Sequence, residues 1–370
     1  MGSPITKLTI CLIFSILTVL GLYAVSDKLT HEHNSFHRSF PPHPIIRAGG
    51  IDLKYNSYYI AGTDSNRVYL SNLTAPLHLL SVNLPDLDTT HIRLSIEDPE
   101  NTKFRRNTKV EVLPPYFYIT DGVTPRLLRG KIGEWHARRF MYDSAFFSVA
   151  IPIGPKSFAL RSTSSKTREH VLGKETNKSP HVKLVPGLLE KQVDGIFCTD
   201  GMLHYNRELS QLIYLYHYRN QYIVTDTSLN LLYRRNTIDT NSRAKIKTAT
   251  ITSENSKTMA TPPLMVNKRS ATYGDRLLVH SDLMAKNESK KAFSKASVID
   301  VYHLKRGKYE MSFYIYPYNE LKLTNFEITN KNLIALHGQY LVVYNTHFDM
   351  FNRGLFPGKV DYTNIKTTPP

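Results

Sequence analysis

The chain has 370 residues, of which 41% are apolar and 21% are charged. This composition excludes a disordered chain, which would be poorer in apolar residues, and a membrane protein with many spans, which would be richer in them. The 47 basic and 31 acidic side chains leave a net charge of +16, which favours an anionic partner or surface without defining a fold. The aromatic residues are mainly Tyr (23) and Phe (16), against one Trp, and both types are enriched in strands. We therefore expect a β-rich globular body.

The N-terminal segment, residues 1–27, predicts a signal anchor that crosses the membrane as a helix. Nineteen residues without a charge, Leu8 to Ser26, lie between Lys7 and Asp27. A helix of that length matches the ~30 Å hydrocarbon core of a bilayer, whereas a cleaved signal peptide has an apolar stretch of only about 7–15 residues. The small residues Ala24 and Ser26 leave a cleaved signal, and with it a secreted protein, as the alternative.

The rest of the chain is expected on the extracytoplasmic side of the membrane. No later window reaches about 18 apolar residues, so a single crossing is predicted. Because Lys7 and the α-amino group precede the anchor, the positive-inside rule holds the head in the cytoplasm. For a Gram-negative bacterium, the body would lie on the periplasmic side of the inner membrane. Cys198 is the one cysteine outside the anchor, so the body has no internal disulfide, and we interpret it as a strand residue.

Residues 28–50 predict a linker rich in proline and histidine. A metal site would need its imidazoles in a fixed geometry, which a chain broken by prolines does not provide, so we expect a solvated spacer. The four histidines concerned are His31, His33, His37 and His43. The globular body is then expected at residues 51–351, followed by a flexible tail at residues 352–370 that ends in two prolines.

One pattern recurs through the body: a short apolar run, a polar turn and a second run. Where the turn contains Asp followed by a small residue, the carboxylate accepts hydrogen bonds from N–H groups two residues on and closes a hairpin. The copies, the last two weaker, are Tyr58–Ser65, Tyr116–Val123, Gly195–Met202, Gln221–Ser228, Arg276–Leu283 and Asn332–Gln339. A further hairpin is expected in Phe146–Arg161, around Gly154-Pro155. The spacing centres near about fifty residues, close to the length of a β-propeller blade.

Three segments of the body resemble successive strands of one blade in six-bladed propellers of the NHL or YWTD-like kind. They are Val298–Tyr302, Tyr309–Tyr316 and Asn332–Leu336. The resemblance implies an all-β propeller of about six or seven blades after one transmembrane helix, in a membrane-anchored extracytoplasmic protein of bacterial type without an assigned activity. It carries over no functional residue. Strand alternation and turn spacing also fit a pair of β-sandwiches, which stays open as the alternative.

Two clusters of aromatic and basic residues are candidates for ligand binding. The first contains the only tryptophan beside arginine, a combination enriched at recognition sites, and the second is a tyrosine cluster that fits a sugar-binding or peptide-binding mouth. Packing at a blade end or between blades is the alternative for both clusters. The candidate residues are Trp135, His136, Arg138, Tyr216, Tyr218 and Arg219.

Asp121, Asp200 and Asp226 are weak candidates for a metal site. Hydrolytic six-bladed propellers bind calcium through carboxylates at strand ends, but a role in closing turns explains all three residues without a metal, so no cofactor is predicted. The sequence has no glycine-rich phosphate loop, HExxH or GxSxG motif. It therefore favours a binding or assembly module without catalytic activity. A calcium-dependent hydrolase of lactonase type and a surface carbohydrate-binding protein are the alternatives.

The excess positive charge is concentrated in two stretches that predict mostly loops. Residues 156–191 carry a net charge of +5 and residues 241–296 carry +7. Because screening limits their reach to about 8 Å at physiological salt, they act on something close by. Anionic lipid of the adjacent membrane or an acidic envelope polymer fits this requirement, and nucleic acid is not expected outside the cytoplasm. The lysines expected to bind anionic vesicles are Lys286, Lys290, Lys291 and Lys295.

Overall fold

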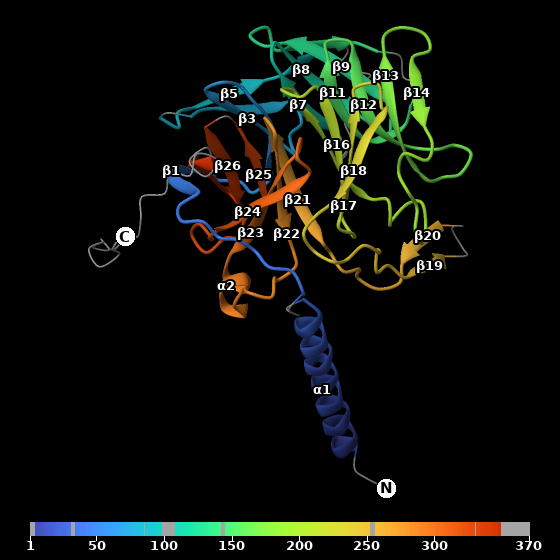
Figure 1. Ribbon diagram of the computed structural model, residues 1–370, viewed down its shortest axis with the longest axis vertical. Helices are drawn as coiled ribbons and strands as arrows, with labels where there is room; N and C mark the ends of the chain where they lie inside the picture. Colours follow the sequence, from blue (N-terminus) through green and yellow to red (C-terminus); the bar gives the residue numbers. More distant parts are fainter. Residues whose placement is uncertain are drawn as a thin grey trace.

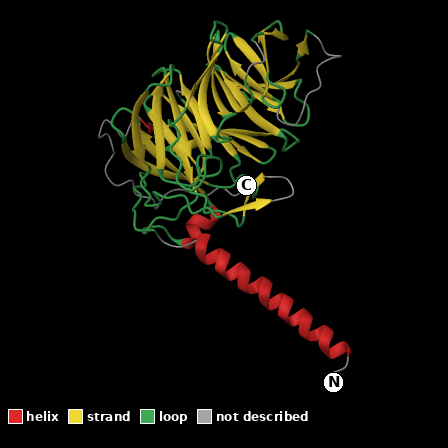
Figure 2. Cartoon of the chain, turned by 90° about the vertical axis from the view of Figure 1, so that its right-hand side faces the viewer, coloured by secondary structure: helices red, strands yellow, loops and turns green. Residues whose placement is uncertain are grey.

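The computed structural model describes residues 4–30, 34–84, 86–97, 108–141, 145–251, 256–329 and 331–348. Its body is a β-propeller of six sheets arranged around one axis, antiparallel except for the short parallel pair of β6 and β10, and it is preceded by a long helix (Figures 1 and 2). The predicted all-β propeller is thereby confirmed at six blades. The alternative of paired sandwiches is wrong, because each sheet packs against two neighbours rather than one.

The first three blades follow one another along the chain. Blade 1 consists of β2 (Tyr58–Thr63), β3 (Arg67–Asn72), β4 (His78–Asn83) and β5 (Thr89–Arg93). Blade 2 consists of β7 (Lys109–Leu113), β8 (Tyr116–Asp121), β9 (Arg126–Lys131) and β10 (His136–Arg139), with β6 (Ser95–Ile96) added beside β10. Blade 3 consists of β11 (Phe147–Gly154), β12 (Ser157–Thr163), β13 (His170–Thr176) and β14 (Val182–Val185).

The next two blades are separated by a small hairpin. Blade 4 consists of β15 (Gly201–Asn206), β16 (Gln211–Tyr216), β17 (Gln221–Asp226) and β18 (Leu231–Asn236). The hairpin consists of β19 (Thr248–Ile251) and β20 (Ser256–Met259). Blade 5 consists of β21 (Asn267–Tyr273), β22 (Arg276–Ser281), β23 (Ser297–His303) and β24 (Lys308–Ile315), with the short helix α2 (Lys290–Lys295) between β22 and β23.

Blade 6 is built from both ends of the chain. It contains β25 (Asn325–Ile328), β26 (Asn332–His337) and β27 (Tyr340–Thr346), and its fourth strand is β1 (Ile45–Asp52), which pairs antiparallel with β27. The first strands of the six blades, β2, β7, β11, β15, β21 and β25, contact one another in a ring around the axis. The N-terminal strand therefore closes the propeller.

The hydrophobic core is divided into six clusters, one between each pair of neighbouring blades. Strand β3, for example, contributes side chains to two of these clusters. Val68 and Leu70 pack toward blade 6, while Tyr69 between them packs toward blade 2. Successive side chains point to opposite faces of a strand, so a strand buried on both faces has a continuous apolar run.

Most of the predicted hairpins are present. The turns after β2, β8, β17 and β26 and the longer loop after β22 join strands of one blade, and β11 and β12 form the expected hairpin around Gly154-Pro155. The exception is Gly195–Met202, which we predicted as a hairpin with a strand before the Thr-Asp turn. Asp194 Oδ1 accepts hydrogen bonds from the N–H groups of Ile196 (2.7 Å) and Phe197 (2.5 Å) there, so the backbone forms a turn and β15 begins only at Gly201.

Two further expectations need correction. Val298–Tyr302 and Tyr309–Tyr316 correspond to β23 and β24 of blade 5, but Asn332–Leu336 lies in β26 of blade 6, because the blade boundary falls between them. The stretches predicted mostly as loops also contain regular structure. β13 to β14 and β19 to β21 lie in them, and α2 begins after Ser289, whose hydroxyl accepts a hydrogen bond from Ala292 N–H as an N-cap.

The linker predicted at residues 28–50 is not a solvated spacer over its second half. Arg38 is only 3% exposed, and its guanidinium donates to both carboxylate oxygens of Asp300, to Glu288 and to the carbonyl of Leu283. Ser312 Oγ also donates to Asp300. The linker prediction failed here because the acidic partners of Arg38 lie some 250 residues later in the chain.

The helix α1 (Pro4–Thr30) extends away from the propeller (Figure 1). Its large apolar side chains from Ile5 to Tyr23 are each more than half exposed. Among the residues that the structure describes, no helix has the combined length and hydropathy needed to cross a membrane. His31, His33 and residues 352–370 lie outside the described residues, and His37 and His43 are exposed.

Replacing Arg38 by Met will destabilise the fold by about 3–5 kcal/mol, because it leaves two carboxylates buried without their cation. Chemical denaturation at neutral pH measures this loss. Lys54→Ala is the control, since it breaks an exposed pair with Asp52 and will cost less than about 1 kcal/mol. Adding Glu288→Gln and Asp300→Asn to Arg38→Met will restore part of the stability. An Arg38→Met loss no larger than that of the control would contradict the prediction.

Candidate functional site

A hollow with a volume of about 980 Å³ lies on the propeller axis. It is bounded by the carboxyl ends of the six inner strands and by the turns that follow them. All six blades contribute at least one lining residue, for example Thr63, Val112, Ile151, Tyr205, Tyr273 and Ile328. Since each inner strand ends here, the cavity opens on the face that carries the turns between the first and second strands of the blades.

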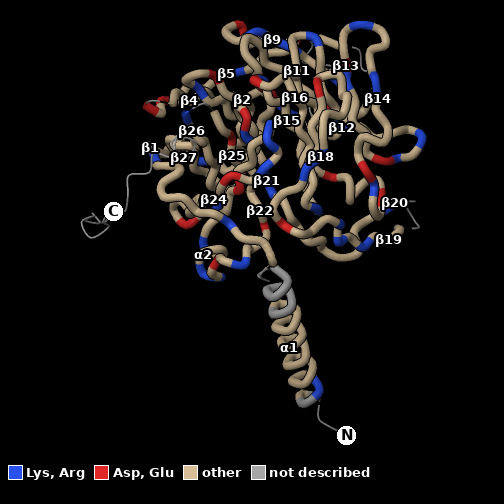
Figure 3. The backbone as a smooth tube through the Cα atoms, viewed as in Figure 1, with Lys and Arg blue, Asp and Glu red and all other residues tan. Residues whose placement is uncertain are grey.

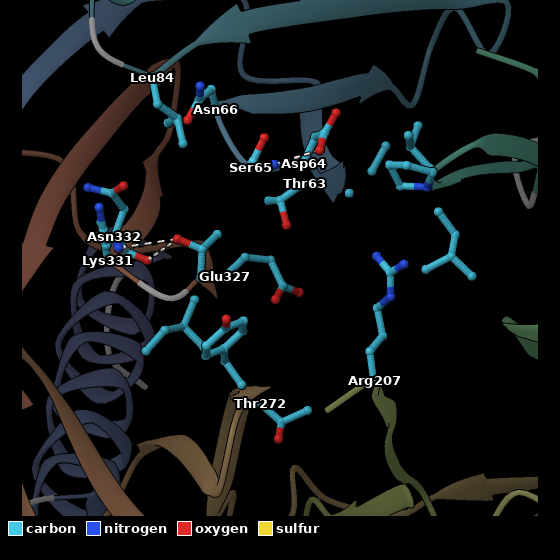
Figure 4. Close-up of a pocket in the computed structure, with 18 of the residues that line it drawn as sticks. Thr63, Asp64, Ser65, Asn66, Leu84, Arg207, Thr272, Glu327, Lys331 and Asn332 are labelled. Carbon is cyan, nitrogen blue, oxygen red and sulfur yellow. Dashed lines mark hydrogen bonds between the residues drawn. The ribbon is translucent and has the colours of Figure 1, made fainter. Parts of the chain in front are cut away.

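Charged side chains of both signs line this cavity. Glu111 and Glu327 project from the inner strands β7 and β25, whereas Arg207 and Lys331 lie in the turns after β15 and β25. Figure 4 shows Glu327 and Arg207 reaching into the same hollow from different blades. Among the described residues, none of these four side chains forms an ion pair. Their charges are therefore available to a ligand.

The two glutamates are held in a poorly solvated channel. Burial raises the pKa of Glu327 to about 7. Burial, together with the negative charge of Glu327, raises the pKa of Glu111 to about 8, although Lys109 acts in the opposite direction. Near neutral pH these carboxyls are therefore partly protonated. A cationic group that enters the cavity would favour their ionised form.

The wall between blades 1 and 2 requires a glycine. A Cβ atom at Gly62 would lie 2.1 Å from the carbonyl oxygen of Val112 on the neighbouring inner strand. Such an approach is sterically forbidden, so any other residue would push β2 and β7 apart. The glycine in the first Thr-Asp hairpin thus sets the width of the ring as well as forming part of a strand.

A second hollow, of about 720 Å³, lies at the other end of blades 4 to 6. It is lined by Asp200, His217 and Tyr218, by Lys268 and Arg269 at the start of β21, and by residues next to α2. Its acidic groups are already paired: Asp200 with Arg161, and Asp282 with Lys268. Unlike the axial cavity, it therefore has no unpaired carboxylate among its described lining residues to bind a cationic group of a ligand.

The Trp135 cluster lies on the outer side of blade 2 rather than in a cavity. Trp135 packs against Tyr69 and Phe117, with ring centroids 6.1 and 5.5 Å apart. His136 Nδ1 lies 2.9 Å from Ser95 Oγ, and Arg138 is exposed on β10. These contacts favour the packing alternative for Trp135.

The Tyr216 cluster is mostly enclosed in blade 4. Tyr216 and Arg219 are 0% and 1% exposed, and the Arg219 guanidinium stacks on the Tyr216 ring at 3.6 Å from its centroid. Arg219 Nη2 donates to the carbonyl of Glu190. Tyr218 instead borders the second hollow. The structure therefore separates these residues from the Trp135 cluster and from the axial cavity.

The three candidate metal ligands do not come together. Asp121 accepts hydrogen bonds from Val123 and Thr124 N–H, and Asp226 accepts them from the N–H groups of Ser228 and Asn230, so both close turns. Asp200 binds Arg161 and its own neighbour Gly201. Among the described residues, no group of three or more His, Cys, Asp or Glu side chains is placed to hold a metal ion.

The sequence analysis missed the charged residues of the axial cavity. Glu111 and Glu327 each lie between two apolar residues of a short inner strand, in KVEVL and NFEI. A carboxylate in the innermost strand of a blade is the pattern that would have identified them, once the blade boundaries were known. Arg207 and Lys331 lie in ordinary polar turns, and nothing local distinguishes them.

No protein-family model and no curated protein matches this sequence. Among solved structures, a member of the DUF4221 family from Bacteroides vulgatus is 13% identical, with a TM-score of 0.44 over 85% of this chain and 99% of that chain. BamB from Moraxella catarrhalis is 8% identical, with a TM-score of 0.41 over 81% and 99% of the two chains. Virginiamycin B lyase from Staphylococcus aureus is 12% identical, with a TM-score of 0.46 over 81% and 98%. These likenesses concern the fold and carry no argument about function.

Glu327→Gln will change how stability depends on pH. A carboxyl with a raised pKa keeps a proton that the unfolded chain releases, so the free energy of unfolding falls as pH rises between the two pKa values. For Glu327 this window runs from 4.5 to about 7. The variant will match the wild type near about pH 4 and exceed its stability by about 1–2 kcal/mol at about pH 8.

Chemical denaturation at a series of pH values tests this expectation, with the exposed Glu134→Gln as the control for loss of one carboxylate. Comparing each variant with the wild type cancels the effect of the buried histidines His204 and His280, whose pKa values burial lowers. Wild-type and Glu327→Gln stabilities that stay parallel across the range would refute the assignment.

Proposed function

We propose that this protein is a membrane-anchored extracytoplasmic β-propeller that acts as a binding module without catalytic turnover. The observation that carries the proposal is the axial cavity, which all six blades line and which holds unpaired charges of both signs. Its volume of about 980 Å³ is at the upper end of the range for small-molecule sites, so it accommodates a small ligand or the end of a chain.

The lining favours a ligand that is polar and carries charges of both signs. Arg207 and Lys331 suit a carboxylate or phosphate, and Glu111 and Glu327 suit an amine, while Tyr273 adds an aromatic surface. Amino acids, peptide termini and amino sugars combine these groups. A neutral oligosaccharide would use fewer of them.

Binding rather than catalysis is proposed because two of the cavity hydroxyls donate to backbone carbonyls and the others show no activating partner among the described residues. Thr329 Oγ1 donates to the carbonyl of Asn332, and Thr272 Oγ1 donates to that of Arg276. Among the described lining residues, no hydroxyl is hydrogen-bonded to a histidine or carboxylate that would activate it as a nucleophile.

The anchoring part of the proposal rests on α1. Its large apolar side chains are exposed from Ile5 to Tyr23, and the uncharged run continues in the sequence to Ser26, beyond the last α1 side chain that the structure describes. Apolar side chains exposed on all sides of a helix require an apolar surrounding. With Lys7 on the cytoplasmic side, the propeller would lie outside the cytoplasm.

Ligand binding is tested by thermal denaturation of the full chain in detergent with a panel of amino acids, dipeptides, amino sugars and neutral oligosaccharides. A zwitterionic compound will raise the melting temperature, because a ligand that binds only the folded state adds about 2.7 kcal/mol at 100 times its Kd. Arg207→Gln will weaken that ligand at least about tenfold, since it loses a charge-assisted hydrogen bond. Arg138→Gln on β10 is the control. The absence of any shift across the panel, or equal weakening by both variants, would count against the cavity.

Anchoring is tested by alkaline extraction of membranes from cells that express the chain. The full-length chain will stay in the pellet and dissolve in detergent. Leu17→Arg combined with Leu20→Arg will release it, because each charge at the centre of a span costs about 2.5–3.5 kcal/mol. Leu73→Arg together with Leu231→Arg places two charges at exposed apolar positions of the propeller and will leave the chain in the pellet. Release of wild-type chain, or a mass that lacks the N-terminal segment, would favour secretion after cleavage.

A further inference from the structure

The segment that follows α1 is fixed to one particular loop of the propeller. This loop, residues 282–296, joins β22 to β23 and contains α2. Asn34 N–H donates to the carbonyl of Met284, and Lys286 N–H donates to that of Phe36. The buried guanidinium of Arg38 then binds Glu288 of the loop and Asp300 of β23. Residues 34–38 therefore cannot separate from the α2 loop without exposing this ion-pair network.

Covalent geometry keeps the end of α1 close to the same loop. The helix ends at Thr30, so four peptide links lead from it to Asn34. At the maximum span per residue they reach about 14 Å. If α1 is the anchor proposed above, the α2 loop lies on the side of the propeller that faces the membrane. Figures 1 and 2 both show α2 beside the end of α1.

Strand direction places the axial cavity on the opposite face. The α2 loop follows the second strand of blade 5, whereas the cavity is bounded by the ends of the first strands. Because neighbouring strands of a blade are antiparallel, the ends of first and second strands lie on opposite faces of the propeller. The cavity therefore opens away from the membrane.

The α2 loop presents basic side chains on its outer surface. Lys286, Lys290, Lys291 and Lys295 are all exposed, and Figure 3 shows basic segments in blue around α2. Phe293 of the same helix is buried and holds α2 against the blade. The one acidic residue between Leu283 and Ala296 is Glu288, and its carboxylate is fully buried beside Arg38. The ion-pair network thus removes the negative charge from this surface and leaves the lysines.

We propose that these four lysines bind anionic phospholipid headgroups of the membrane that holds α1. The inference rests on the proposed anchoring by α1 and adds the orientation of the propeller and the chemistry of its second membrane contact. Lysines near an anionic bilayer are attracted within a Debye length of about 8 Å, which the short tether to α1 allows. Two contacts, one apolar and one electrostatic, then hold the propeller upright with its ligand cavity facing outward.

Amine-reactive footprinting of the full chain in proteoliposomes tests the proposal. The vesicles contain phosphatidylcholine with or without phosphatidylglycerol, and mass spectrometry measures the labelling rate of each lysine. Lys286, Lys290, Lys291 and Lys295 will label several-fold more slowly in the anionic vesicles, and high salt will restore their rates. The internal controls are exposed lysines in or beside turns of the opposite face, Lys156, Lys178, Lys305 and Lys308, whose rates will not depend on the lipid.

The outcomes separate the headgroup contact from the anchor. Flotation of the chain with neutral vesicles establishes anchoring alone. A chain that does not float would overturn the anchor and this proposal together, whereas a chain that floats but labels equally in both vesicle types would overturn only the headgroup contact. Protection by a soluble polyanion but not by phosphatidylglycerol would also overturn it, in favour of an acidic polymer. In a variant with all four lysines replaced by glutamine, the labelling rate of neighbouring Lys322 will no longer depend on the lipid. A rate that still depends on the lipid would overturn the assignment of headgroup binding to these four lysines.

Discussion

The pairing of β1 with β27 is the interaction on which the rest of this propeller depends. It joins the two ends of the chain in one sheet, with seven residue pairs from Ile45↔Thr346 to Asp52↔Tyr340. Every interblade cluster of apolar side chains needs a neighbour on each side, so an open ring would expose two faces of the core. The closed ring also brings six inner strands to one axis, and the axial cavity exists only because of that convergence.

The same fold treats buried charge in two different ways. Around Arg38, one guanidinium binds two carboxylates and fixes a segment that would otherwise be free. On the axis, burial raises the pKa of both Glu111 and Glu327, and the negative charge of Glu327 adds to this effect at Glu111. The paired charges around Arg38 stabilise the structure, whereas Glu111 and Glu327 form no ion pair among the described residues, and we therefore propose the axial cavity that they line as the ligand site.

Local turn chemistry explains which parts of the fold the sequence predicts. An Asp that closes a hairpin acts on its own neighbours, so the turns at Asp121 and Asp226 are visible in the sequence, and the apolar runs beside them predict strands. The prediction failed at Asp200, where the same motif occurs, because Asp194 accepts a hydrogen bond from Ile196 N–H and the residues before Asp200 form a turn instead of a strand. Arg38 and the cavity glutamates were not predicted, since their roles depend on partners brought together only by ring closure.

The orientation that we propose for the propeller combines a local and a global constraint. The network around Arg38 decides which loop lies next to the end of α1, and strand alternation within a blade decides that the cavity lies on the other face. Neither constraint involves the ligand or the lipid. If α1 anchors the chain as proposed, the pairing of β1 with β27 and the network around Arg38 keep the basic loop and the axial cavity on opposite faces, so the two cannot exchange positions without unfolding blade 6 and uncoupling Arg38. The net positive charge of the chain therefore includes two separate groups: the lysines of the α2 loop on one face, and Arg207 and Lys331 at the axial cavity on the other.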